Sequence, residues 1–185
     1  MTQARLGISL CSLAALLWLA VTLADNAGLR INHTPSLPVG LWRIAPLRGP
    51  LARGAIVSFC PPEIAIVSAA RARGFLGPGG CPGGVEPMLK PVVAIAGDRV
   101  SLGADGATVN GRPIPGSRRL GADGAGRPIV AIPLSDDIVG ESAFWALSTD
   151  HPSSFDSRYF GAANEAGIIG VATPWIVWQQ PAYYN

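Results

Sequence analysis

The chain has 185 residues, enough for one domain of ordinary size, and a formal net charge of +2 at pH 7. Only 14% of its residues are charged, with no charge run and no basic tail, which argues against nucleic acid or an acidic partner. Lys90 is the only lysine, and the other basic side chains are arginines.

The first predicted element is an apolar helix over residues 6–24, a run without any charge. About 20 apolar residues cross a bilayer core as a helix. Arg5 flanks one end and Asp25 the other, which favours a cytoplasmic segment at 1–5 and an exported domain at 25–185. A cleaved signal peptide is the alternative, but the run exceeds the usual ~7–15 residues. We therefore expect a retained single-span anchor in a bacterial inner membrane, with the domain in the periplasm.

Two cysteines, Cys60 and Cys81, lie in the exported part. Cysteines of exported domains are usually paired, so we expect a disulfide between them. The two histidines of the chain are far from both cysteines in sequence, so the sequence gives no indication of a zinc site. It indicates no cofactor either.

The next predicted elements are short. Four prolines within residues 25–50 exclude one long helix and favour extended segments around a turn. A strand is expected at 54–59. A short helix is expected at 61–74, with Pro62 at its start, Glu63 in its first turn and Gly74 after its end.

A glycine-rich loop at 74–87 lacks the Gly-Lys-Ser/Thr signature of a phosphate-binding loop. Residues 90–102 read as a strand, a Gly-Asp turn and the start of another strand. Asn-Gly at 110–111 predicts a hairpin. Further strands are expected at 142–149 and 167–178. Strands therefore dominate, which indicates a closed or folded antiparallel β structure.

The C-terminal segment 174–184 is rich in Trp and Tyr. It reads either as a closing strand of the domain or as a segment that rests at the bilayer interface.

Lys90 stands at the start of an apolar run, and its chemistry differs from that of arginine. Burial can lower the pKa of a lysine by several units, whereas arginine keeps its proton. A neutral lysine can act as a general base for a hydroxyl nucleophile. The alternative is codon bias, because a GC-rich genome favours arginine codons and would leave an occasional surface lysine.

Residues 32–43 follow the apolar segment closely and contain Thr34 and Ser36 beside two prolines that stiffen the backbone. A rigid serine close to a membrane suits a nucleophile that meets a membrane-tethered substrate. An ordinary turn with two hydroxyls is the alternative.

Four blocks, in this order, resemble the type I signal peptidases, and among them the conjugative-transfer TraF-type peptidases. They are N-x-T-x-S-x-P-x-G-L-W from Asn32, K-x-V-V-A-I-A-G-D-x-V from Lys90, V-N-G from Val109 and S-x-D-S-R-Y-F-G from Ser154. The resemblance implies a coiled, barrel-like β domain with one short helix. It also implies a substrate bound as an extended strand beside the strand of Lys90.

The resemblance also implies roles for individual residues. Ser36 would be the nucleophile and Lys90 the general base. Thr34 would join the Ser36 backbone N–H in stabilising the oxyanion.

A second set of implied roles lies in the last block. Asp156 matches the acidic residue of the family, which is essential in the TraF type and reads as structural support elsewhere. Arg158 would pair with Asp156, and Ser154 would orient the lysine.

The chain departs from general signal peptidases in three ways. Its last block reads STDHPSSFDSR instead of a Gly-Asn-Asn-rich version, Leu37 replaces a methionine, and one span replaces two. These differences favour the conjugation type and leave the substrate open.

The expected function is that of a membrane-anchored serine endopeptidase that processes an exported, membrane-tethered precursor. By resemblance the precursor is a conjugative pilin, whose cleavage can be coupled to cyclisation in that family. Two alternatives are a general signal peptidase I and a non-catalytic assembly factor of a conjugative or type IV secretion apparatus. A serine–histidine mechanism using His33 or His151 is a rival to the lysine base.

Overall fold

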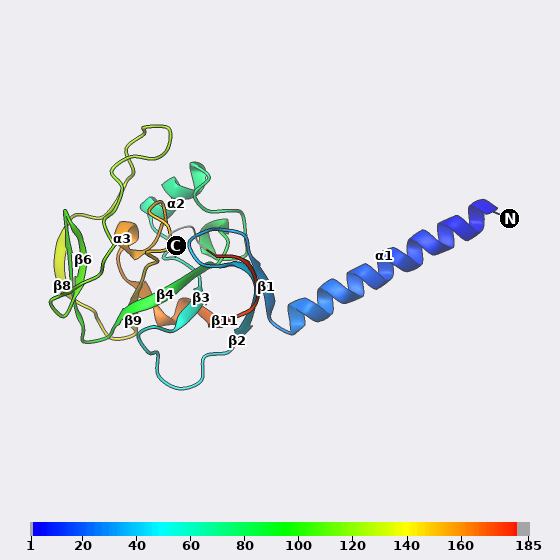
Figure 1. Ribbon diagram of the computed structural model, residues 1–185, viewed down its shortest axis with the longest axis horizontal. Coiled ribbons are helices and arrows are strands. Elements are labelled where there is room, and N and C mark those ends of the chain that lie inside the picture. The colour runs from blue at the N-terminus through cyan, green and yellow to red at the C-terminus, as the bar shows by residue number, and fades with distance from the viewer. Residues whose placement is uncertain (1, 181–185) are drawn as a thin grey trace.

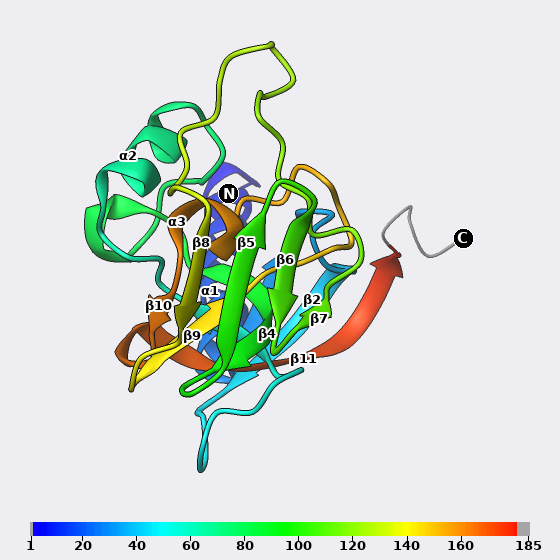
Figure 2. The ribbon, with the colours of Figure 1, turned by 90° about the vertical axis from the view of Figure 1, so that its left-hand side faces the viewer.

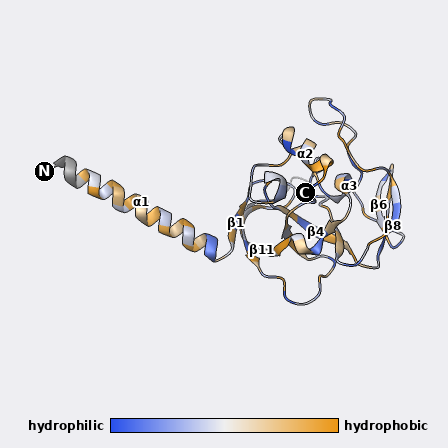
Figure 3. Cartoon of the chain, turned by 180° about the vertical axis from the view of Figure 1, so that it is seen from behind, coloured by the Kyte–Doolittle hydropathy of each residue, from blue (hydrophilic) through white to orange (hydrophobic). Residues whose placement is uncertain are grey.

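The N-terminal apolar run forms one helix, α1 (Thr2–Asn26), that projects from a β-rich domain (Figure 1). The structure is a computed structural model that describes residues 2–180. The most apolar 18-residue stretch of this helix has a mean hydropathy of 2.2, and the length and composition of Leu6–Asn26 would allow it to cross a membrane. Its surface is apolar along most of its length (Figure 3). The helix continues through Asp25 and Asn26, two residues beyond the predicted boundary.

Gly28 turns the chain from α1 directly into the domain. Its φ of +75° lies in the left-handed region, and a Cβ at this position would lie 2.2 Å from the carbonyl oxygen of Ile44. Only glycine fits such a close approach. The amide of Ile44 donates to the carbonyl of Gly28 at 2.8 Å, so the turn is already part of the first sheet.

The main sheet has seven strands, all paired antiparallel, in the order β1-β2-β11-β3-β4-β9-β10. Irregularities in the pairing of β11 and β4 curl it into a half-barrel. The strands are β1 (Leu29–Asn32), β2 (Val39–Ala45), β3 (Ile56–Phe59), β4 (Met88–Ile95), β9 (Ala143–Ala146), β10 (Ala163–Asn164) and β11 (Ile168–Gln179).

A second sheet of four strands, in the order β7-β6-β5-β8, lies at the end of the domain away from α1 (Figures 1 and 2). Its strands are β5 (Arg99–Gly103), β6 (Gly106–Val109), β7 (Arg112–Pro113) and β8 (Ser135–Ile138). The remaining elements are the helices α2 (Ala65–Ala72) and α3 (Ser157–Phe160) and the short 3₁₀ turns η1 (Pro82–Gly84) and η2 (Glu165–Gly167).

The mainly β prediction is confirmed, with few helices and one apolar N-terminal helix. Each predicted strand is present, over a somewhat different range. Asn110 (φ 50°) and Gly111 (φ 75°) form the turn between β6 and β7, as the Asn-Gly pair predicted. β8 has no counterpart among the predicted strands, because three of its four residues are polar.

The predicted helix at 61–74 is shorter than expected. α2 begins at Ala65 with Ile64 as its N-cap, so Pro62 and Glu63 precede the helix and the first turn has no acidic residue. The prolines at 61 and 62 disfavour helical dihedrals in Cys60 and Pro61, and Ile64 has extended dihedrals (φ −130°, ψ 161°), so the helix begins only after Ile64. Gly74 follows the helix with a φ of +77°, as its predicted role as a stop requires.

The C-terminal segment belongs to β11 as far as Gln179, and residues 181–184 lie outside the described residues. Trp175 and Trp178 are nevertheless 62% and 57% exposed. The strand therefore presents apolar side chains to its surroundings, and it lies between β2 and β3 in the sheet.

Cys60, at the end of β3, and Cys81, before β4, are joined by a disulfide with a Cα–Cα distance of 5.4 Å. The bond closes a loop with a sequence separation of 21 that contains α2. It fixes the start of the segment that leads into β4, the strand that carries Lys90.

We predict that a Cys60→Ser/Cys81→Ser variant loses about 3 kcal/mol of unfolding free energy, because the unfolded chain is then no longer cross-linked. Urea denaturation of the full chain in detergent would measure the loss. The control is Cys11→Ser, since Cys11 is free in α1 and should leave the stability unchanged. Free thiols at 60 and 81 in the protein isolated from an oxidising compartment would contradict the prediction.

Candidate active site

Lys90 lies at a core-facing position of β4. The residues of this strand alternate between buried and half-buried, and Lys90 shares the buried face with Met88, Val92 and Ala94. Only 6% of Lys90 is exposed. Its Nζ lies 2.6 Å from the Oγ of Ser36, a residue 54 positions earlier in the chain. The fold therefore brings the only lysine into direct contact with the predicted nucleophile.

Burial lowers the pKa of Lys90 from 10.5 to about 8, because an apolar environment disfavours the charged ammonium. The negative charge of Asp156 opposes this effect, and the positive charge of Arg158 adds to it. A substantial fraction of Lys90 is therefore neutral at mildly alkaline pH, the form in which an amine can accept a proton.

Ser36 lies in the loop that joins β1 to β2 and is 5% exposed. Two contacts hold the loop from outside. The indole Nε1 of Trp42 donates to the carbonyl of Pro38 at 3.0 Å, and the hydroxyl of Ser148 donates to the carbonyl of Ser36 itself. Ser36 is therefore anchored through its own backbone as well as through the prolines on either side.

Thr34 places its hydroxyl beside that of Ser36. Its Oγ1 lies 3.2 Å from the Oγ of Ser36 and 3.1 Å from the Oδ1 of Asn32. This is a position from which a hydroxyl can reach a charge that develops next to Ser36.

Asp156 and Arg158 form an ion pair with no exposed surface. Arg158 Nε and Nη2 each donate to the Asp156 carboxylate at 2.7 Å, and the amide of Ser148 and the hydroxyl of Ser154 also donate to it. Arg158 Nη2 further donates to the carbonyls of Ser148 and Ser154 at 3.0 Å. Both carboxylate oxygens are therefore occupied, which favours a supporting role for Asp156.

Ser154 is buried, and its hydroxyl donates to Asp156 at 2.8 Å rather than bonding to Lys90. The orienting contact that the resemblance implies is therefore not formed in the structure. Both histidines line the same cavity as Ser36. His33 is exposed on the loop that joins β1 to β2, and the Nδ1 of His151 accepts a hydrogen bond from the amide of Ser153. The basic group in contact with the Ser36 hydroxyl is Lys90.

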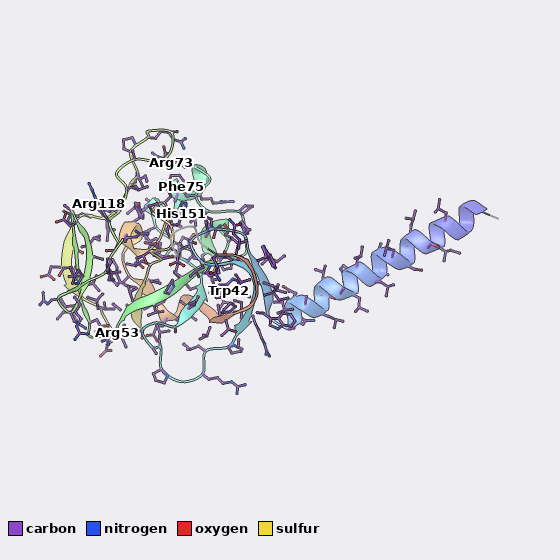
Figure 4. The ribbon with its side chains drawn as sticks, viewed as in Figure 1. Trp42, Arg53, Arg73, Phe75, Arg118 and His151 are labelled. Atoms are coloured by element: carbon purple, nitrogen blue, oxygen red, sulfur yellow. A yellow bond between two sulfur atoms is a disulfide. The ribbon has the colours of Figure 1, made fainter. Side chains whose placement is uncertain are left out.

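An open cavity of about 730 Å³ lies over these side chains. Thr34, Ser36, Lys90 and Ser154 all line it, whereas Asp156 lies beneath the surface. Phe75, Trp42 and His151 are further lining residues that Figure 4 labels. These four side chains thus line one open, largely apolar site.

Sequence reasoning missed two residues of the site. Ser148 received no role, since its contact with Ser36 spans 112 positions and no local pattern indicates it. Asn32 stood in a recognised block but also received no role. Its side chain makes five hydrogen bonds within the loop that joins β1 to β2.

Comparisons with known proteins identify the family to which the chain is similar. The family model described as "Signal peptidase, peptidase S26" matches residues 3–178. A probable conjugal transfer protein TraF of Sinorhizobium fredii is 42% identical over 167 residues, which cover 90% of this chain and 86% of that protein. A plasmid transfer protein TraF of Escherichia coli is 40% identical over 172 residues, with coverages of 93% and 94%. Among solved structures, a signal peptidase I of Enterococcus faecalis matches 69% of this chain and 100% of its own, with 18% identity and a TM-score of 0.40.

We predict that the ε-amine of Lys90 titrates with a pKa of about 8 in the folded protein. Since the chain has one lysine, protein labelled with [ε-¹³C]lysine should give a single ¹³C resonance whose shift can be followed with pH. The same sample in urea should titrate near 10.5, the ordinary value of lysine. A folded-state pKa of 10 or above would contradict the burial of a partly neutral amine.

We predict that Arg158→Met lowers the unfolding free energy by about 3–5 kcal/mol, because it leaves the Asp156 carboxylate buried without a partner. The matched control is Arg99→Met, which breaks the pair with Asp136, where both side chains are more than half exposed. That loss should be at most about 1 kcal/mol. Urea denaturation would compare the two, and equal losses would contradict the importance of the buried pair.

Proposed function

The chain belongs to the signal peptidase family, peptidase S26, and we propose that it is a membrane-anchored serine endopeptidase that uses Ser36 and Lys90 as a catalytic dyad. One observation carries the proposal. The only lysine of the chain is buried on the core face of β4, with its Nζ 2.6 Å from the Ser36 hydroxyl. A non-catalytic assembly factor has no use for this contact.

In the proposed mechanism, neutral Lys90 takes the proton of Ser36 as the Ser36 oxygen attacks a scissile carbonyl carbon. The backbone N–H of Ser36 and the hydroxyl of Thr34 stabilise the oxyanion that forms. The Lys90 ammonium then gives its proton to the leaving amine as the peptide bond breaks. The resulting acyl-enzyme is released by water, or by an amine that yields a new peptide bond.

We propose that the substrate lies in the cavity as an extended strand beside β4. β4 pairs with β3 from Met88 to Pro91, but with β9 only from Val92 onward. The stretch that ends at Lys90 therefore has a side not paired with β9, and Met88, Leu89 and Lys90 line the cavity. An open strand side of this kind can accept the backbone of an extended peptide.

The apolar helix and the family membership indicate a membrane-anchored protein. We propose that residues 6–24 span the inner membrane, with 1–5 in the cytoplasm and 25–185 in the periplasm. Two observations support this arrangement. A disulfide in the domain suits an oxidising compartment, and Ile31, Trp175 and Trp178 expose apolar surface on β1 and β11, on the side where α1 leaves the domain.

We propose that the substrate is the pilin precursor of a conjugative transfer system. The relatives named as conjugal or plasmid transfer proteins support this choice, since they match over most of their length. A general signal peptidase with many clients is the alternative, and it would process reporter precursors that carry unrelated signal peptides.

We predict that Ser36→Ala and Lys90→Arg each reduce cleavage of the precursor by about 10⁶-fold, below detection, because one removes the nucleophile and the other cannot give up a proton. Wild-type initial rates should rise as the pH passes through about 8, the pKa of Lys90. The assay follows the precursor by mass spectrometry after co-expression or after mixing in detergent. A cyclic product would be lighter than the linear one by one water.

Ser101→Ala, in the second sheet, is the matched control and should cleave at the wild-type rate. The dyad is wrong if Lys90→Arg cleaves the precursor normally. An intact precursor in the presence of active wild-type enzyme would instead reject the proposed substrate alone.

A further inference from the structure

Four polar side chains in the site form an unbranched line. Lys90 Nζ lies 2.6 Å from Ser36 Oγ, and Ser36 Oγ lies 3.2 Å from Thr34 Oγ1. The line ends at Asn32, whose Oδ1 lies 3.1 Å from Thr34 Oγ1. The proposed mechanism uses the first three groups and leaves Asn32 without a function.

The orientation of the Asn32 amide is fixed by its neighbours. Its Nδ2 lies 3.0–3.1 Å from three backbone carbonyl oxygens of the same loop, those of Thr34, Leu37 and Pro38. Carbonyl oxygens only accept hydrogen bonds, so the NH₂ group must face them and Oδ1 must face Thr34. Oδ1 also accepts from the backbone N–H of Thr34 at 3.3 Å. The line therefore ends in an atom that is held in place and can only accept.

We propose that Asn32 is a positioning residue whose side-chain carbonyl, as the acceptor end of the line, sets the direction in which the Thr34 hydroxyl points. Each hydroxyl has one hydrogen to donate. Thr34 gives its hydrogen to Asn32, so Ser36 fills the next link by donating to Thr34. A protonated Lys90 then donates to Ser36, and all three links are filled in one direction.

The direction of the line has a consequence for the reaction, which rests on the proposed function. When Lys90 is neutral, the Ser36 hydrogen turns toward it, and the Thr34 hydrogen stays on Asn32. The Ser36 oxygen then receives no hydrogen bond from Thr34, so its lone pairs are free to attack. After the attack the Thr34 hydroxyl can turn to the oxyanion, while Asn32 Oδ1 keeps the Thr34 N–H.

The same line of hydrogen bonds favours the ammonium form of Lys90 in the free protein. Its effect on the pKa of Lys90 can therefore be measured without a substrate. The charged groups near Lys90 are Asp156, which caps α3, Arg158 of α3, Asp150 in the preceding loop and Glu86 before β4. His33 and His151 lie on the cavity wall. Variants at 32 and 34 change none of them. A change in the pKa of Lys90 in these variants therefore reports the line itself.

The test is a double-mutant cycle read from the ¹³C resonance of the single lysine in the full chain. Asn32→Ala should lower the pKa of Lys90 by about one unit, because the line loses its acceptor end. Thr34→Val should lower it as well, and Thr34→Ser, which keeps the hydroxyl, should not. In the Thr34→Val background, Asn32→Ala should have no further effect, because the line is already cut. This non-additivity separates the line from the loop contacts that Asn32 also makes.

Asn110→Ala is the matched control. The side chain of Asn110 also forms hydrogen bonds, to Asp98 and to the amide of Arg99, but Asn110 lies in the turn between β6 and β7, so the pKa of Lys90 should not change. Additive effects of Asn32→Ala and Thr34→Val would overturn the proposal, as would an unchanged pKa in both variants. If Asn32→Ala does not fold, the comparison of Thr34→Val with Thr34→Ser decides, and equal pKa values in these two overturn it.

The outcomes also separate this inference from the proposed function. If the wild type cleaves the precursor but the pKa of Lys90 does not change in the variants at 32 and 34, the role of Asn32 is rejected and the proposed peptidase activity stands. The expected pKa shifts without any cleavage would keep the line and reject the activity on that precursor.

Discussion

The burial of one lysine on the core face of β4 is the constraint from which the rest of the site follows. Between pH 8 and 10.5 the unfolded chain binds the Lys90 proton more tightly than the folded chain does. The burial of Lys90 therefore leaves the unfolding free energy unchanged above pH 10.5. As the pH falls through 8, it lowers the unfolding free energy by about 3 kcal/mol. A protein that places a lysine here accepts this cost at neutral pH. What it gains is an amine that loses its proton readily beside a hydroxyl.

Ser36 is held from two directions. Asn32 ties the loop together from within, and Ser148 holds the Ser36 carbonyl from the segment that follows β9. The amide of Ser148 donates to Asp156, which Arg158 in turn fixes. The buried ion pair is therefore linked to Ser36 through Ser148 without lining the cavity. This link gives Asp156 a way to influence the reaction by supporting the loop and by its charge on Lys90.

Local sequence patterns predicted what depends on local chemistry. The Asn-Gly hairpin, the apolar helix and the strands were accessible because turn residues and hydrophobic runs specify them directly. Lys90 and Ser36 were predicted to act together through the resemblance, because each residue alone has an ordinary alternative, and the structure places the two side chains in contact. The contact between Ser148 and Ser36 was not predictable from the sequence. It forms only when the segment after β9 meets the β1–β2 loop, across 112 positions of the chain. β8 was missed for a related reason, because its polar residues form a strand through pairing with β5.

The short connection between α1 and β1 has a further consequence. Only Ala27 and Gly28 separate the two elements, and Gly28 is locked against Ile44. An extended chain spans at most about 3.3–3.6 Å per residue, so the ten residues from Asn26 to Ser36 keep Ser36 within about 35 Å of the helix end. With α1 as the anchor, Ser36 would work at a nearly constant height above the lipid. A substrate bond would then be selected by its own height above the bilayer as well as by the side chains around it.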